Sequence, residues 1–194
     1  MKANAKYKDS VFTLLFGKPE ILRELYGALE GVDLPADTPV VINTLQDALF
    51  MDRVNDISFE IDGKVIVLME HQSTVNPNLP LRILMYIARL YEKILGERDI
   101  YASKRVTIPF PVFYILYNGS AEMPDSVVLK LSDLFELPGD LSAEDRETAL
   151  ELSVRVININ HGRNAGIAEK CRTLAEYSAF IVREGFNAPP WAGH

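Results

Sequence analysis

DISFEIDGKVIVLMEHQ, residues 56–72, is the stretch that decides the fold, and it predicts two strands joined by a tight turn. From 57 to 62 apolar and polar residues alternate, which is typical of a strand with one buried face. Asp62 and Gly63 favour a hairpin turn, because a tight turn needs positive φ angles at its centre. Residues 65–69, VIVLM, are all apolar, as expected for a central strand covered on both faces.

Polar side chains gather at the open end of this predicted hairpin. Asp56 begins the first strand, and antiparallel pairing across the turn brings it close to residue 69 or 70. Glu70 and Gln72 fall on one side of the second strand, and His71 falls on the other. Mg²⁺ prefers hard oxygen ligands, usually one or two carboxylates with water and substrate phosphate. The hairpin therefore predicts a divalent-metal site on Asp56 and Glu70, with Gln72 beside it.

The spacing of these residues resembles the PD-(D/E)xK nuclease motif. Thirteen residues separate Asp56 from Glu70, and one separates Glu70 from Gln72, which stands where the commonest form has Lys. The longer segments MDRVNDISFEIDGKVIVLMEHQST and NLPLRILMYIARLYEKIL resemble the recombination-promoting nuclease / putative transposase family. YKDSVFTLLFGKPEILREL resembles the opening helix of that family, and the resemblance runs from about Lys6 to Phe180.

The resemblance implies a restriction-endonuclease-like core, which agrees with the α/β fold and mixed central β-sheet flanked by helices that the order of predicted elements indicates. It also implies a metal-dependent DNA endonuclease that hydrolyses phosphodiester bonds and is linked to recombination or mobile elements. On this basis Asp56 and Glu70 bind Mg²⁺ (or Mn²⁺), and the backbone carbonyl of His71 adds a ligand. Asp56, Glu70 and Gln72 are the expected catalytic residues. Gln72 can orient water, but it carries no positive charge.

The segment 79–95 is the clearest helix in the sequence and follows directly on the predicted site. Its expected apolar stripe is Leu81, Leu84, Ile87, Ala88, Tyr91 and Leu95. Arg82 and Tyr86 are four residues apart on another face, where they are expected to contact DNA phosphate. The alternative is a surface Arg82 paired with Glu92 or Glu97 and a partly buried Tyr86.

Asp9 is a further candidate for substrate binding, because it falls on the Asp-x-x-Phe opening motif of the resembled family. The alternative is that Asp9 caps the first helix, a position that favours Asp.

Charge limits how strongly the chain alone can bind its expected partner, DNA. The formal net charge is −7. From 122 to 151 nine acidic residues are opposed by only Lys130 and Arg146, so this one stretch holds the whole excess. No basic stripe of the kind found in high-affinity duplex binders is visible. DNA affinity should therefore be modest and sensitive to salt.

Length and cysteine content bound the rest. We expect one nuclease-like domain at 1–184 and an irregular tail, truncated or disordered, at 185–194. The single cysteine, Cys171, excludes an internal disulfide and fits a reducing cytoplasm, and its role should be packing. No uncharged apolar segment approaches the ~20 residues that span a bilayer, so no membrane partner is expected. Enzymes that cut both DNA strands are often dimers, which makes a homodimer the expected assembly.

Other functional classes fit less well. A Zn²⁺ site needs three or four converging ligands, and the sequence does not group that many around His71. A Ser or Cys hydrolase would need a G-x-S-x-G motif or a Cys near a His, and the sequence has neither. The glycine pattern of nucleotide-binding loops is absent too. The competing hypothesis is a catalytically inactive relative that acts as a DNA- or protein-binding module. Stabilisation by Mg²⁺ or Mn²⁺ would separate the two.

Overall fold

The computed structural model describes residues 11–44, 56–71, 75–98, 100–136 and 149–183, with the backbone alone at 69–71. Residues 11–16 are helical. The further elements are α2 (Pro19–Glu30), β1 (Val40–Ile42), β2 (Asp56–Ile61), β3 (Lys64–His71), α3 (Leu79–Leu95), β4 (Phe110–Tyr117), β5 (Ser126–Lys130), a 3-10 turn (Leu131–Leu134), β6 (Ser153–Asn158), α4 (Ala165–Lys170) and α5 (Arg172–Arg183). Asp9 and the tail expected at 185–194 lie outside the described residues.

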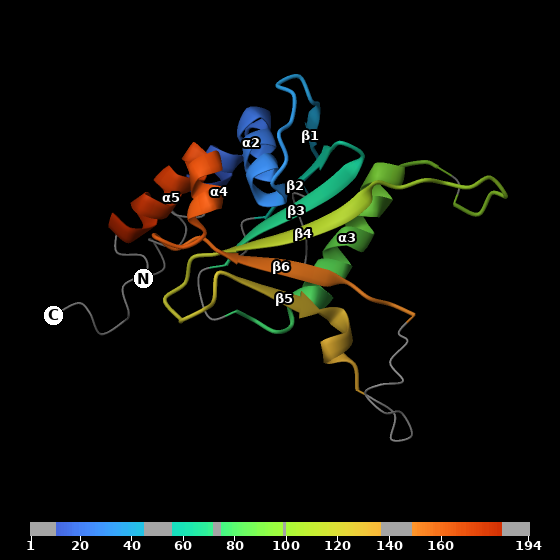
Figure 1. Cartoon of the computed structure of the whole chain (residues 1–194). Coiled ribbons are helices and arrows are strands. Elements are labelled where there is room, and N and C mark those ends of the chain that lie inside the picture. The colour runs from blue at the N-terminus through green and yellow to red at the C-terminus, as the bar shows by residue number, and fades with distance from the viewer. Residues whose placement is uncertain (1–10, 45–55, 72–74, 99, 137–148, 184–194) are drawn as a thin grey trace.

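One mixed sheet organises the molecule, with its described strands in the order β1-β2-β3-β4-β6-β5. β3, β4 and β6 run parallel, whereas β1 and β2 on one side and β5 on the other pair antiparallel with their neighbours. α3 connects the parallel strands β3 and β4 (Figure 1). The predicted α/β fold with a mixed sheet flanked by helices is confirmed.

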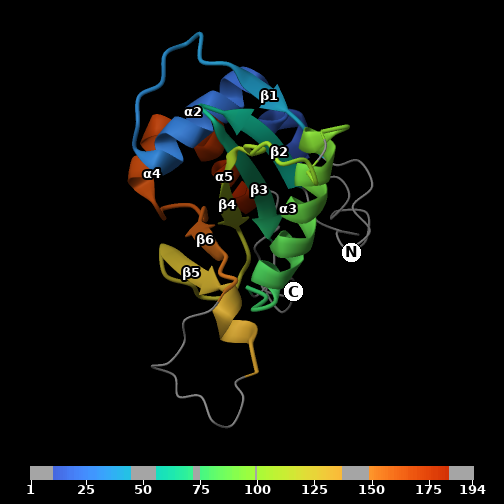
Figure 2. The same ribbon diagram turned by 90° about the vertical axis from the view of Figure 1, so that its right-hand side faces the viewer.

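Helices cover both faces of the sheet. α3 lies on one face, and α2 with α4 lies on the other (Figure 2). The core beneath α3 includes Val65 and Val67 of β3, and the core beneath α2 includes Ile66 and Leu68 of the same strand. The continuous apolar run of β3 is thereby explained, since alternate residues enter two different cores.

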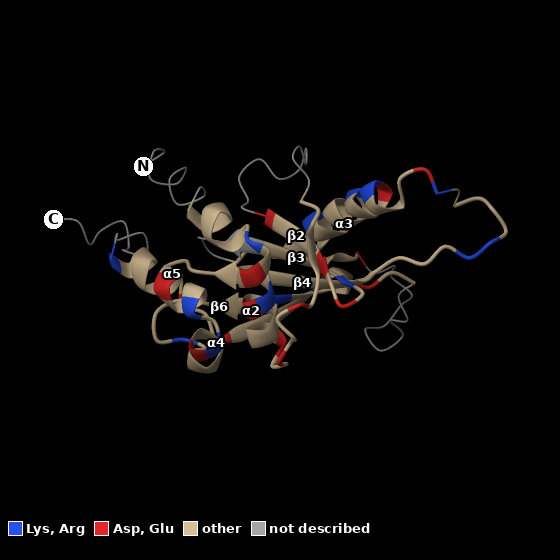
Figure 3. Cartoon of the chain, turned by 90° about the horizontal axis from the view of Figure 1, so that it is seen from above, with Lys and Arg blue, Asp and Glu red and all other residues tan. Residues whose placement is uncertain are grey.

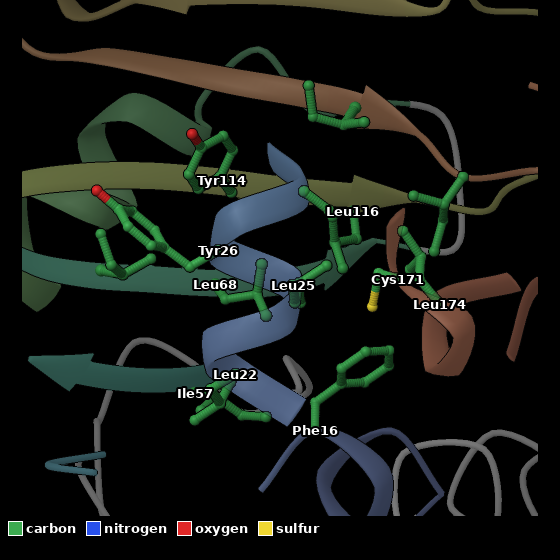
Figure 4. Packing of buried hydrophobic residues seen from close by; sticks show 14 of the residues in the cluster. Phe16, Leu22, Leu25, Tyr26, Ile57, Leu68, Tyr114, Leu116, Cys171 and Leu174 are labelled. Carbon is green, nitrogen blue, oxygen red and sulfur yellow. The ribbon is translucent and has the colours of Figure 1, made fainter. Parts of the chain in front are cut away.

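The α2 side of the sheet is closed by large apolar side chains. Leu22, Leu25 and Tyr26 of α2 point onto the strands, and Leu116 lies near Cys171 and Leu174 (Figure 4). Cys171 is fully buried, as its predicted packing role requires.

The turn between β2 and β3 forms as the sequence predicts. Asp62 has φ 50° and Gly63 has φ 71°, so both central residues of the turn adopt positive φ. The strands then pair in register from Ile61 opposite Lys64 to Asp56 opposite Met69. The turn therefore sets which residues meet at the open end of the hairpin.

The bounds of α3 are those predicted, but the apolar stripe assigned to it is wrong at several positions. Leu81 is 44% exposed and Ala88 is exposed, so neither faces the sheet. The buried residues are Leu79, Pro80, Ile83, Tyr86, Ile87 and Leu90. Apolar residues occur all round this helix, so their spacing alone fits more than one face.

The last helical stretch of the described chain is divided into two helices, α4 and α5. Cys171 has extended backbone angles, φ −127° and ψ 95°, and separates α4 from α5. The backbone N–H of Arg172 donates to a Glu24 carboxylate oxygen of α2, at 2.7 Å. A side chain from a distant helix therefore satisfies one of the first N–H groups of α5, and nothing in the local sequence indicates this.

Charges of both signs are interspersed along the described chain, with Lys and Arg on the loop that projects between α3 and β4 (Figure 3). Among the described helices, none has the length and apolar character needed to cross a bilayer.

Candidate active site

The backbone brings the two predicted metal-binding positions together at one end of the hairpin. Asp56 is the first residue of β2 and pairs with Met69 of β3, so its predicted approach to residue 69 or 70 is confirmed. Glu70 is the next residue along β3 and pairs with Leu116 of β4. The side chains of Glu70 and His71 and the whole of Gln72 lie outside the described part of the structure. Convergence of the two carboxylates therefore stays a prediction.

The Asp56 carboxyl group is partly buried. Burial raises the pKa of Asp56 above its ordinary value of 3.8, and a hydrogen bond from the Tyr86 side chain opposes this rise. Its Oδ2 atom is buried and has no hydrogen-bond partner among the described residues. A buried acceptor without a donor is costly, and a cation or a water molecule would satisfy it.

Two buried hydroxyl groups, of Ser58 on β2 and Tyr86 on α3, belong to the surroundings of Asp56. Ser58 is fully buried and Tyr86 is 2% exposed. Their oxygens are 3.1 Å apart. Ser58 was not predicted as a site residue. The available signal was its position as a polar residue between Ile57 and Phe59 on a predicted strand. Tyr86 was predicted to contact phosphate, but its side chain is buried and its hydroxyl donates to Ser58 Oγ. The same side chain lowers the pKa of Asp56.

Arg82 lies one helical turn before Tyr86, in the first part of α3. The Arg82 side chain is partly exposed, and Arg82 interacts with other residues of the chain. Its backbone N–H donates to the Asn78 carbonyl at 3.2 Å, which belongs to the start of the helix. The contact of Arg82 with phosphate stays a prediction.

The carboxyl ends of the three parallel strands meet at the same edge of the sheet. His71 pairs with Tyr117, and Tyr117 pairs with Asn158, so the ends of β3, β4 and β6 are level. Asn118 is 1% exposed and Asn158 is 3% exposed. The Asn158 amide donates to the Met123 carbonyl at 2.9 Å. Sequence reasoning missed these two buried amides, although a polar residue directly after an apolar strand is a usable signal.

The described residues fit part of a divalent-metal site. No group of three His, Cys, Asp or Glu that could hold an ion occurs within the described ranges, which exclude the side chains of residues 70 and 71. Asp56 contributes one hard oxygen ligand that lacks a partner among them. Such an atom suits Mg²⁺ or Mn²⁺, which bind through few carboxylates and complete their shells with water and phosphate.

The mixed sheet flanked by helices, with this acidic hairpin at its centre, is a restriction-endonuclease-like core. The model of the family described as "Putative transposase, YhgA-like" matches residues 42–174, which is more than half of the chain. The chain belongs to this family, a PD-(D/E)xK-like group of transposases and nucleases. No match was found among curated proteins or among solved structures.

Proposed function

We propose that this protein is a metal-dependent DNA endonuclease that hydrolyses phosphodiester bonds in the context of recombination or mobile elements. The observation that carries the proposal is the buried Oδ2 of Asp56, which lacks a partner among the described residues. Asp56 pairs with Met69, the residue before Glu70 on β3. Membership of a PD-(D/E)xK-like family supports the same chemistry.

Each residue of the proposed site has a distinct role. Asp56 and Glu70 would hold Mg²⁺ or Mn²⁺, together with the His71 backbone carbonyl. A bound ion would polarise the phosphodiester and lower the pKa of the attacking water. Gln72 would orient that water through its amide group. Because Gln72 carries no charge, Arg82 would supply the positive charge beside the phosphate.

The proposal places a condition on the geometry of the site. Side chains alternate between faces along a regular strand, and Asp56 stands directly opposite Met69 rather than Glu70. β3 keeps its regular pairing with β4 through His71, so a shared ion requires the Asp56 and Glu70 side chains to meet around the end of β2, where Asp56 is the first residue. A crystal structure with Mn²⁺ would test this condition directly.

Nicking of a supercoiled plasmid, measured while Mg²⁺ or Mn²⁺ is titrated, tests the proposed activity. Asp56→Asn and Glu70→Gln should each lower the cleavage rate at least about a hundredfold, since losing even an outer-shell partner of a ligand costs about 10–100-fold. Arg82→Ala should lower both DNA affinity and rate. The matched control is Asp125→Asn, which changes an exposed carboxylate paired with Arg163 and should leave the rate unchanged.

The competing function predicts a different outcome. If the parent protein binds DNA or a protein partner but cleaves no plasmid at any metal concentration, the endonuclease proposal is wrong. The chain would then be a catalytically inactive binding module.

A further inference from the structure

Two buried hydroxyl groups stand between α3 and the carboxylate that is expected to bind metal. We propose that Tyr86 and Ser58 are positioning residues of this site, which hold the Asp56 carboxylate in one orientation and leave Oδ2 available to a divalent ion. The inference rests on the proposed endonuclease function, and it assigns a role to residues that do not themselves touch the ion.

The location of the pair is unusual for polar groups. Ser58 and Asp56 are two residues apart on β2, so both are on the face of the sheet that α3 covers. Ser58 is directly opposite Val67, and Tyr86 belongs to the same buried cluster as Val67 and Ile83. Buried hydroxyl groups in such an apolar layer need partners. The Tyr86 hydroxyl donates to Ser58 Oγ, and the interaction of Tyr86 with Asp56 lowers the pKa of that carboxyl group.

The Ser58 end of the pair is fixed by its backbone. Its N–H donates to the Thr44 hydroxyl at 3.0 Å, and its carbonyl accepts from the Asn43 N–H at 2.9 Å. Both bonds come from the segment that follows β1, on the opposite side of β2 from β3. Ser58 therefore provides a fixed anchor for the Tyr86 hydroxyl.

The supply of protons gives these hydrogen bonds a direction when Asp56 is ionised. A hydroxyl group has one proton to donate, and an ionised carboxylate can only accept. In the structure the Tyr86 hydroxyl donates to Ser58 Oγ at 3.1 Å. For Tyr86 to donate to an ionised Asp56 this bond must reverse, with Ser58 donating to the Tyr86 oxygen. In that reversed arrangement the chain of donors ends on the carboxylate, while Oδ2 has no donor among the described residues. This arrangement orients a metal ligand as an outer-shell partner does.

The alternative is that the two hydroxyl groups only help α3 to pack on the sheet. Both roles predict some loss of stability when a hydroxyl is removed. Only the positioning role predicts weaker metal binding, so the response to metal separates the two.

Thermal melting titrated with Mn²⁺ measures metal binding without relying on activity. Tyr86→Phe keeps the ring and removes the hydroxyl, and it should raise the Mn²⁺ concentration for half-maximal stabilisation about tenfold or more. Ser58→Ala should shift this midpoint in the same direction by less. The matched control is Tyr91→Phe, which removes another hydroxyl of α3, one that donates to the Pro109 carbonyl at 2.8 Å. It should leave the midpoint unchanged.

The outcomes distinguish this inference from the function on which it rests. If the parent and Asp56→Asn differ in their response to Mn²⁺, but Tyr86→Phe and Ser58→Ala respond as the parent does, the positioning role is wrong and the nuclease proposal stands. If the parent itself shows no response to Mn²⁺, the proposed metal site is wrong, and the inference falls with it. Should Tyr86→Phe fail to fold, Ser58→Ala decides alone.

Discussion

Asp56 is a carboxyl group whose surroundings favour its uncharged form. Burial raises its pKa above 3.8, so the folded state binds a proton at pH values where the unfolded state has released it. Stability in the absence of metal therefore falls as the pH rises from 3.8 through the raised pKa, and stays lower above it. Burial therefore makes the charged form of Asp56 energetically unfavourable in the absence of metal.

Asp56→Asn removes this charge and keeps the shape of the side chain. In EDTA at pH 7 the variant should be as stable as the parent or slightly more stable. The difference should shrink as the pH falls through 3.8, because below this value the parent's carboxyl group becomes protonated in both states. Thermal melts of both proteins between pH 3.5 and 8, at intervals of about half a pH unit, measure this difference in stability.

The same melts with Mg²⁺ or Mn²⁺ provide the second half of the test. The parent should gain stability, because an ion that binds only the folded state stabilises it by mass action. Asp56→Asn should lose most of that gain. An aspartate that merely caps the start of a strand would give the reverse pattern: clear destabilisation by the substitution in EDTA, and no change in the metal response.

At the scale of elements, α3 has one buried face and one exposed face that both carry leucine. Leu90 is fully buried, whereas Leu81 is 44% exposed. The same substitution at the two positions therefore compares burial on a single helix. It also tests the orientation of α3 that places Tyr86 against Ser58.

Leu90→Ala should lower the free energy of unfolding by about 2–5 kcal/mol, because it leaves a cavity in the core between α3 and the sheet. Leu81→Ala should change it by about 0.5 kcal/mol or less, as expected for an exposed position. Urea unfolding of both variants measures the difference. Equal losses would mean that α3 presents a different face to the sheet.

At the scale of the whole molecule, a polar cluster ties the α2 layer to the sheet. Glu30, the last residue of α2, accepts hydrogen bonds from Tyr114 of β4 and from Arg155 of β6. The guanidinium group of Arg155 also lies over the Tyr114 ring, 4.5 Å from its centroid. One carboxylate therefore joins a helix to two neighbouring strands.

Glu30→Gln tests the contribution of this cluster. Burial alone would raise the pKa of Glu30, but the hydrogen bonds from Tyr114 and Arg155 and the nearby positive charges hold it below 4.5. The stability it contributes is therefore present above pH 4.5 and is lost as the pH falls through the lowered pKa. At pH 7 we expect a loss of about 1 kcal/mol, because Arg155 is partly exposed to solvent.

The control for this prediction is Glu176→Gln, which breaks an exposed pair with Arg172 on α5. Its effect should be much smaller than that of Glu30→Gln, because both side chains of this pair are exposed to solvent. Urea unfolding of the parent and of both variants, at pH 7 and at pH 3, measures the loss of stability that each substitution causes. A Glu30→Gln loss that persists unchanged at pH 3 would contradict the electrostatic explanation.

The local sequence determined the elements whose signals are short-range. Alternation and an apolar run defined β2 and β3, Asp62 and Gly63 supplied the turn, and the helical segment 79–95 was recognisable as α3. The approach of Asp56 to residue 69 in the β2–β3 hairpin was predictable for the same reason, since the turn fixes the register of the two strands.

Tertiary contacts decided what depended on residues far apart in the chain. Tyr86 faces inward because Ser58, 28 residues away, meets its hydroxyl on the sheet. α5 begins at Arg172, whose backbone N–H donates to the carboxylate of Glu24, 148 residues away. Periodicity cannot contain such information, because it records only neighbours within a few turns, and α3 offered apolar side chains to more than one face. The packing of the sheet selected the face, and with it the partners of Asp56.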